Sequence, residues 1–328
     1  MKAVLANSIG GPEVLQIGEA EKPSPEEDEI IVRIEYAGVN MLDTIERRGM
    51  FRVPPRDTPY IPGVEGAGTI EAIGSNVSDY KVGERVSYMD LLSGAYSEYA
   101  RVASESKIIR IPDDIPSEVA AAMTITGMTS HYLVHEYVDI KPGMNVVVHS
   151  AAGGVGSMLT QWLKHYDARV IGTTSSLEKA EVSKANGCDD VILYLEQDFS
   201  KEVMRLTDGN GADLILDAVG KPTIPLDLEC IGRRGTIVLY GVPGGKPDPV
   251  DPFSLMFRRS VRLCGGDCDD WTLTPEETQG RMNDVYEGYR KGFIKPNITE
   301  VVPLEEVARV HTEMESRKSS GVYVLKVT

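Results

Sequence analysis

The 328-residue sequence predicts an α/β protein that combines a doubly wound parallel sheet with a second, β-rich domain. Short strand-like runs separated by glycines fill the first 120 residues. From about Pro116 onward, strands alternate with amphipathic helices, the pattern of a parallel sheet with helices on both faces. A glycine-rich turn joins one of these strands directly to a helix. At roughly 150 residues per domain, the length fits two domains.

The composition is that of a globular protein with an acidic surface. The formal net charge is −16, the hydrophobic fraction is 41% and the charged fraction is 26%, which excludes disordered and collagen-like chains. This charge repels polyphosphate, so no nucleic-acid partner is expected. No apolar run reaches the roughly 20 residues of a membrane helix, and the first residues meet Gly10 and Gly11 too soon for a signal peptide. We therefore expect a cytoplasmic protein with no membrane partner.

The β-rich part begins with a strand-like run over residues 29–36. The glycines that mark tight turns after it are Gly63, Gly66, Gly68 and Gly74. At the other end of the chain, an amphipathic helix carrying Val307, Val310 and Met314 precedes a final strand over 322–325. This tail is long enough to return to the first domain.

The alternating part can be followed element by element. A helix is predicted where Val155, Met158, Leu159, Trp162 and Leu163 recur at helical spacing. The other predicted elements are strands over 145–149, 169–173, 191–193, 214–216, 236–239 and 261–264, and a helix over 177–186. Such alternation predicts βαβ units and a parallel sheet.

The turn after strand 145–149 is rich in small residues. It reads Ala151-x-Gly153-x-x-Gly156 and leads directly into the next helix. In a dinucleotide-binding fold, small residues let the backbone approach a pyrophosphate, whose charge lies at the positive N-terminus of the helix. An alanine replaces the first glycine of the pattern, but the position between a strand and a helix supports the assignment. The alternative is a tight turn that binds no ligand.

The end of the following strand favours NADPH over NADH. An NAD site has an Asp or Glu about 20 residues past the loop, which bonds the ribose hydroxyls and repels a 2′-phosphate. This chain has Thr173, Ser175 and Lys179 in that stretch. As alternatives, Ser175 could cap a helix, because Ser175-x-x-Glu178 fits a capping box, and Lys179 could lie on a solvated helix face.

Cysteines and histidines do not form a metal-binding pattern. Only Cys264 and Cys268 are close among the four cysteines, and the second pair that a zinc site needs is missing. His131 and His135 could share one helix face, but the glutamate of H-E-x-x-H is absent between them. We expect no metal ligands.

Several segments together resemble the zinc-independent quinone oxidoreductase branch of the medium-chain dehydrogenase/reductase superfamily, the branch that includes zeta-crystallin. The stretch 143–164 is similar to the signature of that branch, with Val147 where the pattern usually has leucine. The other matching segments are 37–44, 62–68, 94–99 and 315–321. In zinc alcohol dehydrogenases, a cysteine and a histidine occupy the places of Asn40 and Val64, and a four-cysteine lobe follows the glycine-rich motif. None of these ligands is present in this sequence.

The resemblance implies a GroES-like catalytic domain over 1–120 and 266–328 and a Rossmann NADPH-binding domain over 121–265. The substrate site is expected where the β-rich domain meets the carboxyl ends of the parallel strands. Without a Lewis acid, the expected acceptors are electron-poor quinones or α,β-unsaturated carbonyls, which accept a hydride readily.

The candidate catalytic residues come from the family's active-site segment. By resemblance, Asn40 lines the nicotinamide and the substrate, with Asp43 beside it; the alternative for Asn40 is a turn asparagine after a strand. The family often has a tyrosine where this chain has Ile45. That difference leaves Thr44, Tyr60 or solvent as the proton donor.

The resemblance also implies the residues that bind the cofactor. It places a glycine-rich turn at the pyrophosphate, hydroxyls, a lysine and a tyrosine around the 2′-phosphate, and a glycine near the nicotinamide. The candidates are Asn40, Thr126, Ala152, Gly153, Gly154, Val155, Thr173, Ser175, Lys179, Tyr194, Gly241 and Arg317.

The function that these features imply is an NADPH-dependent quinone oxidoreductase acting on a small molecule. One alternative is an enone or enoyl-thioester reductase, and another is an NADPH-binding protein without physiological turnover. The resemblance further implies a homodimer formed at an edge of the parallel sheet, to which the run Val261–Leu263 would contribute.

Overall fold

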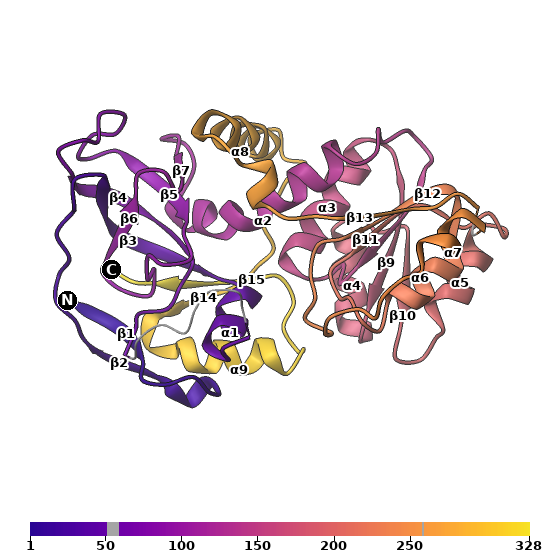
Figure 1. Ribbon diagram of the computed structural model, residues 1–328, viewed down its shortest axis with the longest axis horizontal. Coiled ribbons are helices and arrows are strands. Elements are labelled where there is room, and N and C mark those ends of the chain that lie inside the picture. Colours follow the sequence, from indigo (N-terminus) through magenta and orange to yellow (C-terminus); the bar gives the residue numbers. More distant parts are fainter. Residues whose placement is uncertain (51–58, 258) are drawn as a thin grey trace. The chain divides into compact units, whose positions relative to one another are not determined.

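The structure is a computed structural model, and it describes residues 1–50, 59–257 and 259–328. The described residues divide into two compact units, each with its own sheet (Figure 1). The first unit contains Met1–Ile125, Thr272–Tyr286 and Ile298–Thr328, and the second contains Thr126–Trp271 and Glu287–Asn297.

The first unit is built around a seven-stranded sheet. Its path runs β14-β15-β3-β4-β5-β7, β6 pairs with β3, and β1 and β2 form a separate two-stranded sheet. The strands are β1 (Lys2–Ala6), β2 (Leu15–Glu19), β3 (Glu29–Val39), β4 (Glu65–Ile73), β5 (Arg85–Met89), β6 (Tyr99–Ala103), β7 (Lys107–Arg110), β14 (Ile298–Pro303) and β15 (Val322–Lys326). Strand β15 pairs antiparallel with β3, aligning Tyr323 with Val39, so the prediction that the tail returns to the first domain is confirmed.

The helices of the first unit are short. They are η1 (Pro12–Val14), α1 (Met41–Arg47), η3 (Leu304–Glu306) and α9 (Val307–Glu315). Val307 and Val310 of α9 are buried in a core with Ile30, Val32 and Tyr88 from the sheet, which confirms the predicted apolar face. Strand β3 lies in the middle of this core because its Ile and Val side chains are buried on both faces of the sheet.

The second unit contains a six-stranded sheet in which every neighbouring pair is parallel. Its strands are β8 (Asn145–His149), β9 (Arg169–Thr174), β10 (Asp190–Leu193), β11 (Ala212–Asp217), β12 (Ile231–Leu239) and β13 (Arg262–Gly265). The spatial order is β10-β9-β8-β11-β12-β13, a doubly wound order that reverses between β8 and β11. Open sheets of this kind bind ligands at the carboxyl ends of the strands on either side of the reversal.

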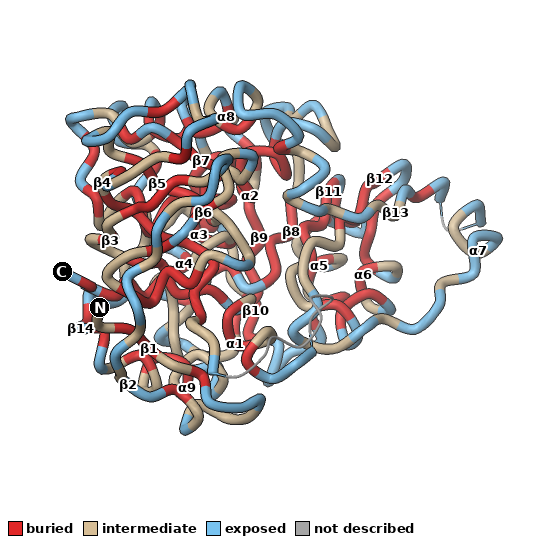
Figure 2. Tube along the Cα trace, turned by 60° about the vertical axis from the view of Figure 1, so that its left-hand side comes forward, coloured by how far each residue is buried: buried red, intermediate tan, exposed pale blue. Residues whose placement is uncertain are grey.

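Helices follow the strands of the second unit as predicted. They are α3 (Gly154–His165), α4 (Leu177–Ala185), α5 (Phe199–Leu206), α6 (Ile224–Cys230), α7 (Pro252–Phe257) and η2 (Asp269–Trp271). Helix α3 packs on β8 and β9 and buries Met158, Leu159, Trp162 and Leu163. Figure 2 shows the strands of this unit mostly as buried segments, whereas α7 is an exposed arm.

Two helices have residues in both units, α2 (Ser117–His135) and α8 (Pro275–Arg290). Although α2 has 19 residues, no helix of the described chain is long and apolar enough to cross a membrane. Helix α8 was not predicted, because its polar composition hides a stripe of buried residues at helical spacing. The stripe consists of Thr278, Met282, Val285 and Tyr286.

The unit boundaries differ from the predicted domain boundaries by a few residues at 121–125 and 266–271 and by a whole segment at 287–297, which belongs to the second unit. The Phe293 ring stacks on His165 at 3.8 Å between centroids and meets the Trp162 ring at 5.1 Å. The Lys295 amide donates to Oε1 of Gln161 at 2.6 Å. These contacts hold the segment on α3, although it is far from α3 in the sequence.

Candidate functional site

The glycine-rich turn lies at the carboxyl end of β8, next to the reversal of the sheet. Ser150 takes a left-handed conformation with φ of 55°, and the Gly153 amide donates to the Ser150 carbonyl at 2.8 Å. Gly153 then caps α3. A Cβ on Gly156 would lie 2.3 Å from the Ser150 carbonyl oxygen, so only glycine permits this close approach of turn and helix.

The start of α3 fits a dinucleotide pyrophosphate. Gly153, Gly154 and Val155 are partly exposed, and the first turn consists of uncharged residues. The first N–H groups of a helix have no partner within the helix, and together with the helix dipole they favour an anion. Ala152 lies just before them and is buried at 3% exposure, so its contribution is to keep the turn compact.

The residues predicted at the 2′-phosphate lie at the ends of β9 and β10. The Tyr194 amide donates to the Thr174 carbonyl at 3.1 Å, which brings the turn after β10 beside the turn after β9. The Tyr194 side chain is exposed, and Ser175 and Lys179 are half-buried. Burial lowers the pKa of Lys179, and the Glu178 carboxylate opposes that effect.

Helix α4 is capped differently from the predicted alternative. Its N-cap is Ser176, whose Oγ accepts from the Lys179 amide at 3.3 Å. The capping-box interpretation of Ser175 is therefore wrong, because the helix starts one residue later. Ser175 lies one residue before the N-cap, so its side chain does not cap the start of α4.

Thr173 belongs to a buried cluster beneath the turn that the sequence did not reveal. Nδ1 of His149 lies 2.8 Å from the Thr173 hydroxyl, and Nε2 lies 2.8 Å from Oδ1 of Asp227. Asp217 accepts from the Thr223 hydroxyl at 2.7 Å. The carboxylates of Asp227 and Asp217 raise the pKa of His149 although burial lowers it, and burial raises the pKa of Asp227 to about 6. A histidine that ends an apolar strand directly before the turn was the available signal.

Two other candidates from the second unit lie at different places. Gly241 follows β12, and a Cβ there would lie 2.8 Å from the Ala218 carbonyl oxygen, so the turns after β11 and β12 meet closely. Thr126 is buried at 4% exposure in α2. Arg317, by contrast, lies in the first unit, exposed after the end of α9, with a φ of 58°.

Asn40 and Asp43 are brought together at the start of α1 in the first unit. The Asn40 amide donates to Oδ2 of Asp43 at 2.7 Å, and the Val64 amide donates to Oδ1 at 3.0 Å. The Asn40 side chain donates through Nδ2 to Oε2 of Glu65 at 2.6 Å, and Oε1 of Glu65 accepts from the Ile125 amide at 2.7 Å. Burial raises the pKa of Asp43 to about 7 and that of Glu65 to about 8, against the opposing effect of these donors.

Further residues attach to Asp43 from distant parts of the chain. The Tyr96 hydroxyl donates to Oδ2 of Asp43 at 2.8 Å and lies 3.4 Å from Nε2 of His311. Arg47 donates through Nε to Nδ1 of His311 at 3.3 Å. The sequence prediction missed these three residues and Glu65; the signal for His311 was its place at helical spacing from Val307 and Met314 on α9.

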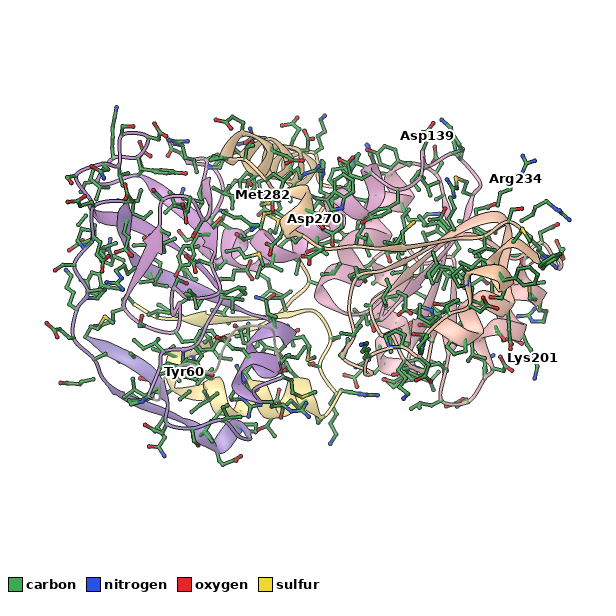
Figure 3. All side chains as sticks on the ribbon, in the orientation of Figure 1. Tyr60, Asp139, Lys201, Arg234, Asp270 and Met282 are labelled. Carbon is green, nitrogen blue, oxygen red and sulfur yellow. The ribbon has the colours of Figure 1, made fainter. Side chains whose placement is uncertain are left out.

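The described contacts of Thr44 and Tyr60 lie elsewhere. The Thr44 hydroxyl donates to the Met41 carbonyl at 2.8 Å, within α1. Tyr60 exchanges backbone hydrogen bonds with Ala6 and packs its half-buried ring against the core of the first unit (Figure 3). Both hydroxyls were candidate proton donors.

No group of three or more His, Cys, Asp or Glu side chains in the described ranges could hold a metal ion. His131 and His135 share a face of α2 as expected, but their rings stack at 4.1 Å, and Nδ1 of His135 bonds the His131 carbonyl. Stacked rings do not point their nitrogens at a common ion.

Comparison with known proteins supplies the family. Residues 26–113 match the alcohol dehydrogenase GroES-like domain, and residues 154–276 match the zinc-binding dehydrogenase domain. The chain is 35% identical to a quinone oxidoreductase of Pseudomonas aeruginosa over 324 residues, 99% of both chains. It is 33% identical to a 2-haloacrylate reductase of a Burkholderia species over 98% of both chains. The structure of Escherichia coli quinone oxidoreductase complexed with NADPH superimposes with a TM-score of 0.93, covering 99% of this chain and 100% of that one at 32% identity.

A GroES-like domain joined to a parallel dinucleotide-type sheet defines the medium-chain dehydrogenase/reductase class. Within that class, the chain belongs to the quinone oxidoreductase branch of the family, as the full-length matches show. The resemblance inferred from the sequence motifs is confirmed.

Proposed function

We propose that the chain is an NADPH-dependent quinone oxidoreductase that works without zinc. The turn before α3 carries the proposal, because Gly156 lies so close to the Ser150 carbonyl that any side chain would collide with it. A helix start this closely packed, followed by Ser175 and Lys179 where an NAD site has an acid, supports a dinucleotide with a 2′-phosphate. The relatives named quinone oxidoreductase, one of them crystallised with NADPH, support both the cofactor and the acceptor.

The residues of the second unit would hold NADPH by position and charge. The amides of Gly153, Gly154 and Val155 would bind the pyrophosphate at the start of α3. Ser175 and Lys179 would bind the 2′-phosphate. Tyr194 would lie beside the adenosine, since its backbone is tied to the end of β9 and its ring is exposed.

When bound, NADPH supplies a hydride from C4 of its nicotinamide. The chain must then stabilise the negative charge that grows on the acceptor oxygen, and this requires a fixed hydrogen-bond donor. We assign that part to Asn40. Its amide group has two N–H bonds, of which one is donated to Glu65, so the other remains for the acceptor.

We propose solvent as the source of the proton that completes the reduction. The Thr44 hydroxyl is already bonded within α1, and the Tyr60 ring packs against the core of the first unit. The zinc-independent assignment rests on Asn40 and Val64, whose side chains replace the cysteine and histidine of the zinc enzymes.

A reductase of α,β-unsaturated carbonyl compounds is the second candidate. It is favoured by the relative named 2-haloacrylate reductase, whose substrate is an unsaturated acid. Ile45 also stands where the quinone oxidoreductases often have a tyrosine, so a hydroxyl near the acceptor is lost.

The acceptor can be tested by following NADPH oxidation at 340 nm with a quinone, a simple enone, an enoyl thioester and a 2-haloacrylate. Faster turnover of the quinone is expected. Faster turnover of the enone, thioester or haloacrylate would replace the first candidate by the second. NADPH binding without turnover of any acceptor would contradict both and favour a cofactor-binding protein.

We further infer that the chain forms a homodimer through the β13 edge of the parallel sheet. Strand β13 ends the sheet, and α7 before it exposes apolar side chains, with Phe253, Met256 and Phe257 each at least 60% exposed. Exposed apolar side chains beside an unpaired edge support a two-fold contact. Sedimentation should give a dimer that Phe257→Asp weakens and Leu273→Asp, at another exposed site, does not. A monomeric wild type at micromolar concentration would contradict the inference.

We also propose a cytoplasmic location. The four cysteines, Cys188, Cys230, Cys264 and Cys268, form no disulfide in the structure, and thiols persist in reducing compartments. Alkylation during lysis should label the thiols as free. A disulfide in the protein as extracted from cells would argue for another compartment.

A further inference from the structure

A row of four buried side chains in the first unit runs from the end of α1, through α9 and the segment before β6, back to the start of α1. Arg47, His311, Tyr96 and Asp43 are each 0% exposed. The contacts along the row are 3.3 Å from Arg47 to His311, 3.4 Å from His311 to Tyr96 and 2.8 Å from Tyr96 to Asp43. His311 lies 268 positions after Asp43 in the sequence, yet one row of contacts connects them through Tyr96.

The direction of every hydrogen bond in this row is fixed, because only one assignment of donors and acceptors fits the four side chains. A guanidinium can only donate, so Nδ1 of His311 must accept from Arg47. In a neutral imidazole the proton then lies on Nε2, which faces the Tyr96 oxygen. Because that oxygen accepts from His311, its own hydrogen is left for Asp43. Burial and the nearby Arg47 keep His311 neutral by lowering its pKa to about 3.

The far end of the row is electrically balanced. Arg47 forms an ion pair with Glu315 of α9 and donates to the Gly10 carbonyl at 2.6 Å. The Arg47 charge is therefore neutralised by Glu315, and Arg47 needs no direct ion pair with Asp43. The Arg47 cation fixes the tautomer of His311, and the tautomer fixes the direction of the Tyr96 hydroxyl.

Asp43 joins the segment of Asn40, the proposed hydrogen-bond donor to the acceptor, to the segment of Val64. Its two oxygens accept the backbone amides of Asn40 and Val64, so one carboxylate holds the end of β3 beside the start of β4. The other charged groups that face it are the carboxylates of Glu46 and Glu65, which disfavour a second negative charge. An ionised Asp43 is the stronger acceptor for all three donors, because protonation converts one oxygen into a hydroxyl, which is a weaker acceptor and brings a hydrogen that needs a partner of its own.

We propose that Tyr96 and His311 are positioning residues for the reaction, which keep Asp43 ionised and thereby fix the backbone of Asn40. The assignment of Asn40 to the acceptor rests on the proposed function, but the positioning itself does not. Tyr96 gives the carboxylate its third donor, and His311 keeps that donor aimed.

The test is a pH titration followed by NMR of the backbone amides of Asn40 and Val64, which report the charge on Asp43 without any substrate. Tyr96→Phe should move the midpoint of both signals upward by about one pH unit, since a hydrogen bond to a charged group is lost. His311→Leu should move it in the same direction. His311→Gln, which keeps a donor and an acceptor, should restore most of the wild-type midpoint.

The matched control is Tyr88→Phe, which removes an equally buried hydroxyl in β5 that does not donate to Asp43. Its midpoint should equal that of the wild type. If Tyr96→Phe also leaves the midpoint unchanged, the positioning role is overturned.

Enzyme kinetics separate this inference from the proposed function. With a quinone that the wild type reduces, the acid limb of kcat should move with the amide midpoint in Tyr96→Phe, while KM for NADPH stays constant. An amide shift without a shift of the acid limb would confine the row to a structural role and overturn the proposal. Absence of wild-type turnover would instead contradict the proposed function, and the amide titration would still decide the positioning of Asn40.

Discussion

Two histidines, one in each unit, are equally buried and have opposite protonation behaviour. His149 at the end of β8 is 1% exposed and His311 on α9 is 0% exposed. His149 lies between the Thr173 hydroxyl and the Asp227 carboxylate, whereas His311 lies between Arg47 and the Tyr96 hydroxyl. Burial disfavours the charged form of both rings.

The neighbours decide the outcome. The carboxylates of Asp227 and Asp217 reverse the effect of burial and raise the pKa of His149. Arg47 adds to the effect of burial and lowers the pKa of His311 to about 3. The first arrangement favours a protonated imidazole paired with a carboxylate next to the glycine-rich turn, and the second favours a neutral ring that fixes the direction of a hydrogen bond. Burial alone therefore does not predict the charge of a histidine.

The largest effect on stability is expected from removing the Asp227 carboxylate, which raises the pKa of His149. Asp227→Ala should lower the free energy of unfolding by about 3–5 kcal/mol at pH 6, because it leaves the buried imidazole without its partner. Chemical denaturation measures the loss. The control Glu229→Ala, an exposed carboxylate on the same helix, should cost less than about 1 kcal/mol. Equal stability of the two variants would show that the bond between His149 and Asp227 adds no stability.

The pH dependence of stability should separate the two rings. The unfolded chain binds a proton at His311 below pH 6.5, but the folded chain does so only near its folded pKa of about 3. Stability from this residue is thus present above pH 6.5 and is lost as the pH falls toward 3. His149, with its raised pKa, contributes stability below its ordinary pKa and loses it as the pH rises.

Thermal or chemical unfolding of His311→Gln checks this difference. Between pH 6.5 and 4, the variant should lose about 3 kcal/mol less stability than the wild type, because the glutamine does not titrate. His149→Gln should lose less stability than the wild type on the alkaline side. Parallel pH curves for His311→Gln and the wild type would mean that His311 protonates normally in the folded state.

A smaller effect on stability is expected from removing the Thr173 hydroxyl, the uncharged partner of His149. Thr173→Val removes the hydroxyl that lies 2.8 Å from Nδ1 and should cost about 1 kcal/mol of unfolding free energy. The neighbouring Thr174→Val should cost less, since its hydroxyl is 3.4 Å from the Ser176 carbonyl. If Thr174→Val costs as much as Thr173→Val, the bond to His149 contributes nothing specific.

The parts of the fold that depend on local pattern were predictable from the sequence. Strand β8 and helix α3 were confirmed because an apolar run and a helical stripe lie on either side of the small-residue turn. Helix α8 was missed because its buried stripe lies among many polar residues. The segment 287–297 was expected with the first domain but packs in the second unit, since its contacts with α3 join residues more than 100 positions apart.

The candidate site was predictable to a similar extent. Asn40 and Asp43 belong to one short segment, and the structure brings them together. Tyr96 and His311 could not be found in this way, because Tyr96 reaches Asp43 and His311 reaches Tyr96 only in the folded unit, across large separations in the sequence. Thr44 shows the opposite case, since a residue adjacent to Asp43 in sequence directs its hydroxyl to a carbonyl within α1.

The cofactor preference tests the central claim most directly. The measurement is kcat/KM for NADPH and for NADH with one quinone, for the wild type, for Lys179→Ala and for Lys184→Ala, an exposed lysine on the same helix. The wild type and Lys184→Ala should prefer NADPH, and Lys179→Ala should reduce that preference about ten- to a hundredfold while kcat/KM for NADH stays unchanged. A wild type that prefers NADH, or an unaltered preference in Lys179→Ala, would contradict the account.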